Sequence, residues 1–127
     1  MFDSQRSPCP IASSLDLIGD RWTLVLLRDM MLGKTTYSEL LDSPECITTS
    51  VLAERLERMQ KHGLIERQQY QDRPRRFRYL LTAKGRDLLP VAQALCRWGN
   101  RHLDDTWIPP ERFMSANPAD LPLAARD

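Results

Sequence analysis

Arginine is concentrated in one short segment of this 127-residue chain. Five arginines occur between positions 67 and 78, where the only acidic residue is Asp72. A guanidinium group stays charged and donates several hydrogen bonds, so such a cluster is typical of a surface that binds phosphates. The alternative interpretation of the cluster is a solvated hairpin turn with no ligand, but it leaves five like charges without an anionic partner. We predict that this segment binds DNA through Arg73, Arg75, Arg76 and Arg78. Part of the recognition would come from shape readout, because arginine prefers a narrow minor groove.

A second group of candidate contacts lies upstream of these arginines. Thr48, Thr49 and Ser50 stand where a helix N-cap is expected, directly before apolar residues at helical spacing. Their hydroxyls can donate to phosphates or base edges, but they lack the bidentate reach of arginine to guanine. Arg55 follows on the same predicted helix, with pairing to Glu54 as its competing role. We predict a recognition helix that contacts DNA through the three hydroxyl residues and Arg55.

Cys9 is the one residue whose position suggests reaction chemistry. It precedes Pro10 at an expected helix start, where unsatisfied N–H groups favour the thiolate that reacts with oxidants and electrophiles. We predict redox sensing at Cys9, with Cys46 of a second subunit as a candidate disulfide partner. The alternative for Cys9 is an inert cysteine that caps and packs. Cys96, on an apolar stripe, is expected to be structural.

The first half of the chain predicts three helices. Residues 10–18 carry one apolar stripe after a proline. Residues 20–32 are apolar almost all round, which is typical of a helix buried at the centre of a small domain. Thr36 and Glu39 match a capping box at the start of a short third helix, which a turn over 42–45 ends.

The second half predicts a reading unit and a long helix. A helix over 48–62 is followed by two strands, over 64–71 and 77–81, that enclose the arginine-rich turn. Thr82 can cap a last long helix, which Pro90 should kink or divide. The fold class expected from this order is mainly α with a small β-hairpin wing, a winged helix-turn-helix.

The predicted last helix has more apolar surface than one small domain needs, so a partner surface is expected. A closed two-fold homodimer is the simplest arrangement. We predict dimerisation through the N-terminal and C-terminal helices, with contacts from Ile11, Leu15, Leu95 and Trp98. Two recognition helices about 34 to 36 Å apart would then fit a near-palindromic operator in double-stranded DNA.

One domain, over residues 1–107, is expected to contain the DNA-binding unit and the dimerisation helices. Residues 108–127 are rich in Pro, Ala and Asp and lack periodicity, so we predict a flexible or loosely docked tail.

The formal net charge of +1 conceals an uneven distribution. Residues 48–103 hold 12 basic and 5 acidic side chains, which places the positive charge on the predicted reading unit. A basic face on a nearly neutral chain is sufficient for phosphate binding, although a charge-balanced solvated surface is the alternative. Three cysteines, no long apolar run and no signal-peptide pattern predict a cytoplasmic protein without membrane association.

Several short motifs resemble the HxlR-type transcriptional regulators over roughly residues 8 to 103. They are Cys9-Pro10-Ile11-Ala12, Leu15-Asp16-Leu17-Ile18-Gly19-Asp20-Arg21-Trp22, Leu26-Leu27-Arg28-Asp29, Tyr37-Ser38-Glu39-Leu40, Leu52-Ala53-Glu54-Arg55-Leu56, His62-Gly63-Leu64-Ile65 and Leu81-Thr82-Ala83-Lys84-Gly85. The resemblance implies a dimeric bacterial winged helix-turn-helix regulator of the MarR-like group. It also implies that Cys9 occupies the position through which many members respond to oxidants, quinones or aldehydes.

The sequence departs from the family pattern at two positions that bear on DNA. Ser50 stands where relatives often carry a basic residue early in the recognition helix. Arg78 stands near a position where relatives often have an acid, which makes this wing unusually basic. We therefore expect the wing to supply much of the affinity.

The sequence predicts a sequence-specific DNA-binding regulator, a repressor, controlled by oxidation or electrophile modification of Cys9. The alternative is a winged-helix module that binds an acidic protein partner instead of DNA. No enzyme, cofactor or metal site is expected, because the sequence has no zinc-type cysteine spacing, phosphate loop or nucleophile elbow. The two histidines, His62 and His102, lie at expected C-terminal ends of helices. The helix dipole stabilises a positively charged side chain there, which is the ordinary explanation for a histidine at such a position.

Overall fold

The helices and the hairpin follow one another along the chain in the predicted order. The computed structural model describes residues 6–124. Residues 1–5 and 125–127 lie outside this range. The first stretch belongs to the N-terminus, where no export signal is expected, and the second is the end of the expected tail. The described elements are α1 (Pro10–Ile18), α2 (Thr23–Met31), α3 (Tyr37–Leu41), α4 (Thr49–Lys61), β1 (Ile65–Gln71), β2 (Arg76–Leu81), α5 (Ala83–Arg86), α6 (Leu89–His102), α7 (Glu111–Ser115) and a 3-10 helix (Pro118–Asp120).

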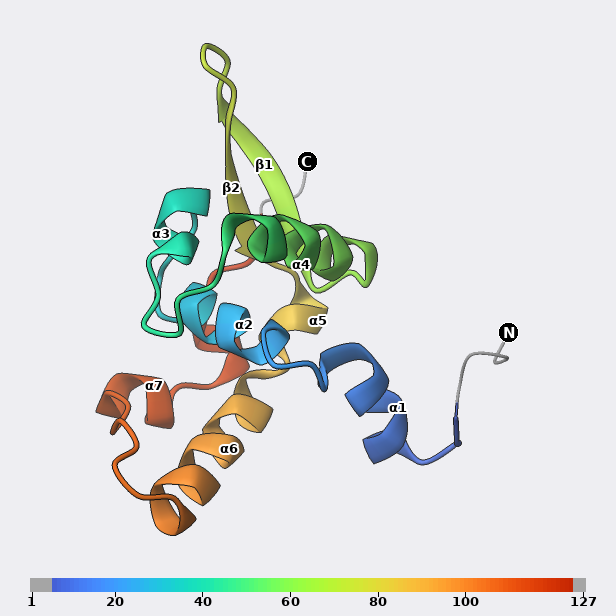
Figure 1. Cartoon of the computed structure of the whole chain (residues 1–127), viewed down its shortest axis with the longest axis vertical. Coiled ribbons are helices and arrows are strands. Elements are labelled where there is room, and N and C mark those ends of the chain that lie inside the picture. Colours follow the sequence, from blue (N-terminus) through green and yellow to red (C-terminus); the bar gives the residue numbers. More distant parts are fainter. Residues whose placement is uncertain (1–5, 125–127) are drawn as a thin grey trace.

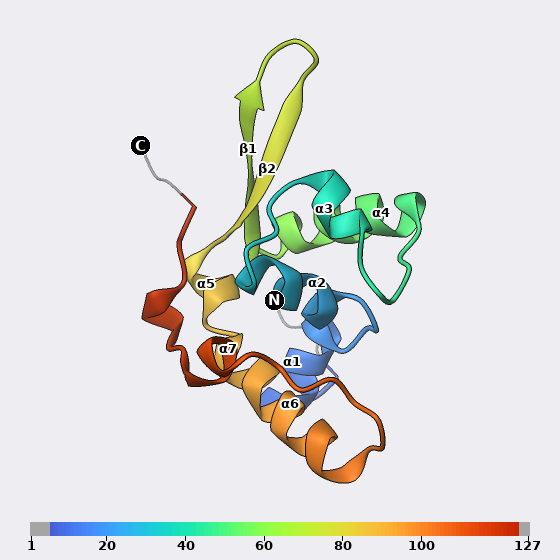
Figure 2. The same cartoon turned by 90° about the vertical axis from the view of Figure 1, so that its left-hand side faces the viewer.

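The wing, which is the hairpin of β1 and β2, lies at one end of the molecule, and α6 lies at the other (Figure 1). Helices α2 to α5 form the body between them, while α1 extends to one side. The C-terminal segment runs from α7 along the body toward the base of the wing (Figure 2). Within residues 6–124, every helix is too short or too polar to cross a lipid bilayer.

The core forms around α2, as the apolar content of this helix predicts. Leu26 and Leu27 are 1% and 0% exposed. Leu40 of α3 and Leu52 and Leu56 of α4 are also buried. Because Leu52 and Leu56 are one helical turn apart, they share the inner face of α4, and the opposite face is left to solvent. The structure confirms a winged helix-turn-helix in which α3 and α4 are the two helices of the motif.

Side chains satisfy backbone N–H groups at the starts of α2 and α3. The Asp20 carboxylate accepts hydrogen bonds from the backbone N–H groups of Trp22 and Thr23, and from the Thr23 hydroxyl at 2.6 Å. Burial alone would raise the pKa of Asp20, but these hydrogen bonds lower it below its ordinary value. At α3, Thr36 and Glu39 form the predicted capping box.

Thr82 joins the end of the wing to the helices that follow. Its hydroxyl donates to the Gly63 carbonyl at 2.6 Å and accepts from the Gly85 backbone N–H at 3.1 Å. Gly85 in turn approaches the Leu64 carbonyl so closely that a Cβ atom would lie 2.0 Å from that oxygen. The contact explains a glycine at this position, since any side chain would push α5 away from the root of β1.

The predicted long helix is divided into two helices, which is one of the two outcomes expected from Pro90; the other was a kink. Helix α5 ends at Arg86, and α6 begins at Leu89 with Pro90 in its first turn. Proline is tolerated there because the first N–H groups of a helix have no partner within the helix.

Residues 108–124, for which the composition predicts a flexible or loosely docked tail, lie against the rest of the chain. They contain α7, whose Phe113 is 4% exposed, and the 3-10 helix. The buried Gln93 amide of α6 donates to the carbonyls of Phe113 and Ala116, at 2.9 and 2.8 Å. The Ala124 N–H donates to Leu81 at the end of β2. Phe113 and Ala124 are buried, and Met114, Ala116 and Leu121 pack against the core. Because these residues lie on short helices and loops, their spacing along the sequence shows no periodic pattern.

We expect Thr82→Val to lower the free energy of unfolding by about 1–2 kcal/mol, because it leaves the Gly63 carbonyl and the Gly85 N–H without their partner. Urea denaturation at a fixed protein concentration measures this change. Thr48→Val is the matched control, since that cap is exposed and accepts one long hydrogen bond of 3.4 Å. Equal losses in the two variants would contradict the role assigned to Thr82.

Candidate nucleic-acid interface

The start of α4 presents the three hydroxyl residues that the sequence singles out. Thr48 is the N-cap, and its side chain accepts from the Val51 N–H. Thr48, Thr49 and Ser50 are all exposed, while Leu52 one turn later is fully buried. The helix therefore buries one face and offers its polar first turn to a partner.

Tyr37 fixes this first turn to α3. Its hydroxyl donates to the Thr49 carbonyl at 2.9 Å, and its half-buried ring packs against the core. Tyr37 thus packs against the core and also holds the start of α4. No sequence pattern indicated this bond, because it joins residues on two different helices.

Arg55 is held within the fold. Its Nη1 lies 2.6 Å from Glu54 Oε1, and its Nε lies 3.1 Å from Asp20 Oδ2. The competing role expected from the sequence, pairing with Glu54, is therefore observed. The second partner, Asp20, accepts hydrogen bonds from the backbone N–H groups at the start of α2, so Arg55 links α4 to the central helix.

A second arginine supports the turn before α4. The Arg28 guanidinium contacts both oxygens of Glu45, at 2.8 and 3.0 Å, and also Asp29 Oδ1. The hydrogen bond from Arg28 holds the pKa of Glu45 below its ordinary value. Sequence reasoning missed this network, because Glu45 is 17 residues from its partner. Its effect is to anchor the segment that leads into the recognition helix.

The tip of the wing carries the least restrained positive charge. Arg73, Arg75 and Arg76 are exposed, and none has an ion-pair partner among residues 6–124. The Gln71 amide donates to the Arg73 and Pro74 carbonyls and so holds the turn. These three guanidinium groups remain available to an anionic ligand.

Two other wing arginines lie over aromatic rings. The Arg67 guanidinium carbon is 3.9 Å from the centroid of the Phe77 ring, and that of Arg78 is 4.2 Å from the centroid of Tyr70. Such cation–π contacts hold a charge in place without neutralising it. The five arginines therefore divide into restrained and free groups, a distinction that their sequence spacing did not indicate.

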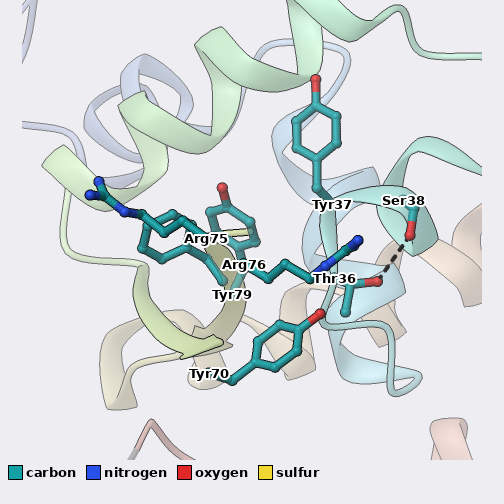
Figure 3. A pocket seen from close by; sticks show the side chains of 8 residues that line it. Thr36, Tyr37, Ser38, Tyr70, Arg75, Arg76 and Tyr79 are labelled. Carbon is teal, nitrogen blue, oxygen red and sulfur yellow. Dashed lines mark hydrogen bonds between the residues drawn. The ribbon is translucent and has the colours of Figure 1, made fainter. Parts of the chain in front are cut away.

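A groove of about 390 Å³ separates the wing from α3. In Figure 3, Arg76 extends toward Thr36 and Ser38, and the hydroxyl end of Tyr70 points to the same side. Arg75 extends away from this group. The groove thus combines the free guanidinium of Arg76 with the hydroxyl groups of Thr36 and Ser38, a combination that suits a phosphate.

Backbone pairing fixes the wing relative to α3. The Tyr79 N–H donates to the Thr35 carbonyl at 2.7 Å, and Thr36 forms an isolated antiparallel bridge with Arg78. These contacts tie β2 to the residues that begin α3, so the groove has two walls joined at its base.

The cysteines occupy three different environments. Cys9 is exposed at the N-cap of α1, and its side chain makes no capping hydrogen bond. Cys46 is exposed in the turn before α4, with a φ of 62°. Cys96 is half-buried on α6, where burial raises the pKa of its thiol. Cys9 and Cys46 are therefore more accessible to a reagent in solution than Cys96.

The four residues expected at a dimer interface are exposed in the single chain. Ile11 and Leu15 of α1 are 71% and 52% exposed, and Leu95 and Trp98 of α6 are 52% and 58% exposed. They lie on two helices outside the wing, and such large apolar side chains are costly to leave in water.

Comparisons with known proteins agree with this architecture. The family model for HxlR-like helix-turn-helix proteins matches residues 17–106. An uncharacterised HTH-type transcriptional regulator of Synechocystis sp., sll1512, is 35% identical over 96 residues, which is 76% of this chain and 71% of the relative.

Two solved structures extend the likeness to three dimensions. The crystal structure of PA1607 superposes with a TM-score of 0.76 at 29% identity, covering 94% of this chain and 84% of that one. The redox regulator HypR in its oxidized form superposes with a TM-score of 0.69 at 31% identity, covering 76% of this chain and 99% of that one. The chain belongs to the HxlR-like helix-turn-helix family and is a DNA-binding transcriptional regulator.

Proposed function

We propose that this chain acts as a homodimeric repressor that binds a near-palindromic operator. The single observation that carries the DNA-binding surface is the set of unpaired arginines at the wing tip, Arg73, Arg75 and Arg76. Thr48, Thr49 and Ser50 at the start of α4 would enter the major groove, and the wing would follow the adjacent backbone and minor groove. Arg55 would support α4 through its ion pairs rather than read bases.

The dimer in this proposal forms through α1 and α6. Burying apolar side chains such as Leu95 and Trp98 would stabilise it by about 25 cal/mol per Å² of surface removed from water. In each subunit, α6 lies at the end opposite the wing (Figure 1). A two-fold contact there leaves both wings and both recognition helices free for DNA.

Control by Cys9 is the regulatory part of the proposal. HypR, a redox regulator, has been solved in oxidized and reduced forms, and this chain resembles both. A peroxide would convert the Cys9 thiolate to a sulfenic acid with loss of hydroxide, and attack by a second thiolate would then form a disulfide with loss of another hydroxide. Because Cys9 stands at the N-cap position of α1, this bond would move a dimerisation helix and thereby change the spacing of the recognition helices.

We expect Arg75→Ala combined with Arg76→Ala to weaken binding to specific and random duplex DNA alike. The plot of log K against log salt should flatten by up to about 2 units, because each arginine that neutralises a phosphate releases about 0.9 counterion. Fluorescence anisotropy across a salt series measures both changes.

Arg112→Ala is the control for this test, since it removes a charge from α7, away from the wing. It should leave the slope unchanged. An unchanged slope in the double variant would exclude the wing as a phosphate contact. If the wild-type protein bound neither its own upstream region nor random duplex at low salt, the protein-interaction alternative would replace DNA binding at this surface.

We expect Leu95→Glu to shift the protein from dimer to monomer, because two carboxylates would have to be buried near the two-fold axis. Sedimentation velocity over a concentration range gives the oligomeric state, and operator affinity should fall with it. Leu123→Glu, at a residue that is 43% exposed on the C-terminal segment, should remain dimeric. A Leu95→Glu protein that stays dimeric would place the interface elsewhere.

For the sensor, Cys9→Ser should keep the dimer and its operator affinity but lose the response of DNA binding to diamide. Diamide oxidises two thiols to a disulfide, so Cys46→Ser tests the partner, and the half-buried Cys96→Ser serves as the control that still responds. Mobility shifts with and without reductant give the readout. A normal response in Cys9→Ser would move the sensor to another thiol.

A further inference from the structure

Tyr70 lies at an irregular position of the wing. The pairing passes from Gln69 with Phe77 to Gln71 with Arg76, so Tyr70 is an extra residue on β1 that has no cross-strand partner. A β-bulge of this kind changes the direction of a side chain and is often found near functional sites. The bulge therefore turns the Tyr70 ring independently of the regular alternation along β1.

The ring of Tyr70 lies against the Arg78 guanidinium, at 4.2 Å from centroid to Cζ. Tyr70 is 41% exposed and does not belong to the described core or to the residues packed on it. Within residues 6–124, its hydroxyl makes no hydrogen bond. Core packing therefore gives no reason for an aromatic residue at this position, whereas the contact with Arg78 does.

The backbone of Arg78 is fixed at the junction between the wing and α3. Arg78 bridges to Thr36, and the next residue, Tyr79, donates to the Thr35 carbonyl. The ring of Tyr70 then restrains the side chain as well. Arg78 thus differs from Arg75 and Arg76, whose backbones lie nearer the turn of the hairpin.

We propose that Tyr70 is a positioning residue that holds the Arg78 guanidinium ready for a DNA phosphate. This inference rests on the proposed DNA-binding function of the wing. A long side chain loses rotamer freedom when it binds, and a ring that already restrains it removes part of this loss. The contact leaves the positive charge intact, so the ring contributes affinity without contributing a counterion to the salt dependence.

A double-mutant cycle on operator binding tests this proposal. Tyr70→Leu keeps an apolar side chain but removes the ring face, and we expect operator affinity to fall about two- to fivefold with an unchanged salt slope. Tyr70→Phe keeps the ring and should bind as the wild type does. Arg78→Ala should lower the slope by about 1 unit, and Tyr70→Leu should have no further effect in that background.

The restraint itself can be measured without DNA. The side-chain protons of Arg78 should show the upfield NMR shift of protons above a ring in the wild type and in Tyr70→Phe, and should lose it in Tyr70→Leu. Thermal melting of each variant shows whether it is folded, and Trp107→Leu, an exposed aromatic substitution outside the wing, is the control for nonspecific effects.

Three results would overturn the positioning role. A loss in Tyr70→Phe equal to that in Tyr70→Leu would mean that the hydroxyl contacts DNA directly. Additive losses in Tyr70→Leu and Arg78→Ala would mean that the two residues act separately, and a wild-type affinity in Tyr70→Leu would mean that the ring does not matter. If the wild type failed to bind duplex DNA while the NMR shift remained, the proposed function would fail and the ring contact would stand.

Discussion

The structure depends on how a two-stranded hairpin is held at its root. An isolated hairpin is marginally stable in water, so a wing that presents charge must be anchored by other elements. Here Leu64, Ile65, Tyr79 and Leu81 bury the root of the hairpin in the core. The residues before α3 pair with β2 on one side, and the C-terminal segment donates to Leu81. The position of every wing arginine relative to α4 follows from this anchoring.

The arginines show how neighbours decide the role of one residue type. Arg28 and Arg55 form ion pairs with carboxylates and connect the central helix α2 to α4 and to the turn before it. Two wing arginines keep their charge but are restrained by aromatic rings. The arginines at the wing tip lack both kinds of partner within residues 6–124. A count of basic residues would treat all of them alike, although only charge that remains unpaired can displace counterions from DNA.

The C-terminal segment connects the two ends of the molecule. Gln93 of α6 holds α7 through two backbone carbonyls, the Arg86 side chain donates to the Leu121 carbonyl, and Ala124 reaches the end of β2. The segment therefore contacts both the helix proposed for dimerisation and the root of the wing.

The sequence by itself determined the local features, because caps, apolar spacing and turn residues act over a few positions. Thr36 with Glu39, the N-cap at Thr48 and the break near Pro90 could all be predicted. Tertiary structure alone decided which distant residues meet: Arg55 with Asp20, Arg28 with Glu45, and Ala124 with Leu81. The same holds for the docking of residues 108–124 and for the bulge that turns Tyr70 toward Arg78. These contacts join separate elements, and their geometry exists only after the core has brought those elements together.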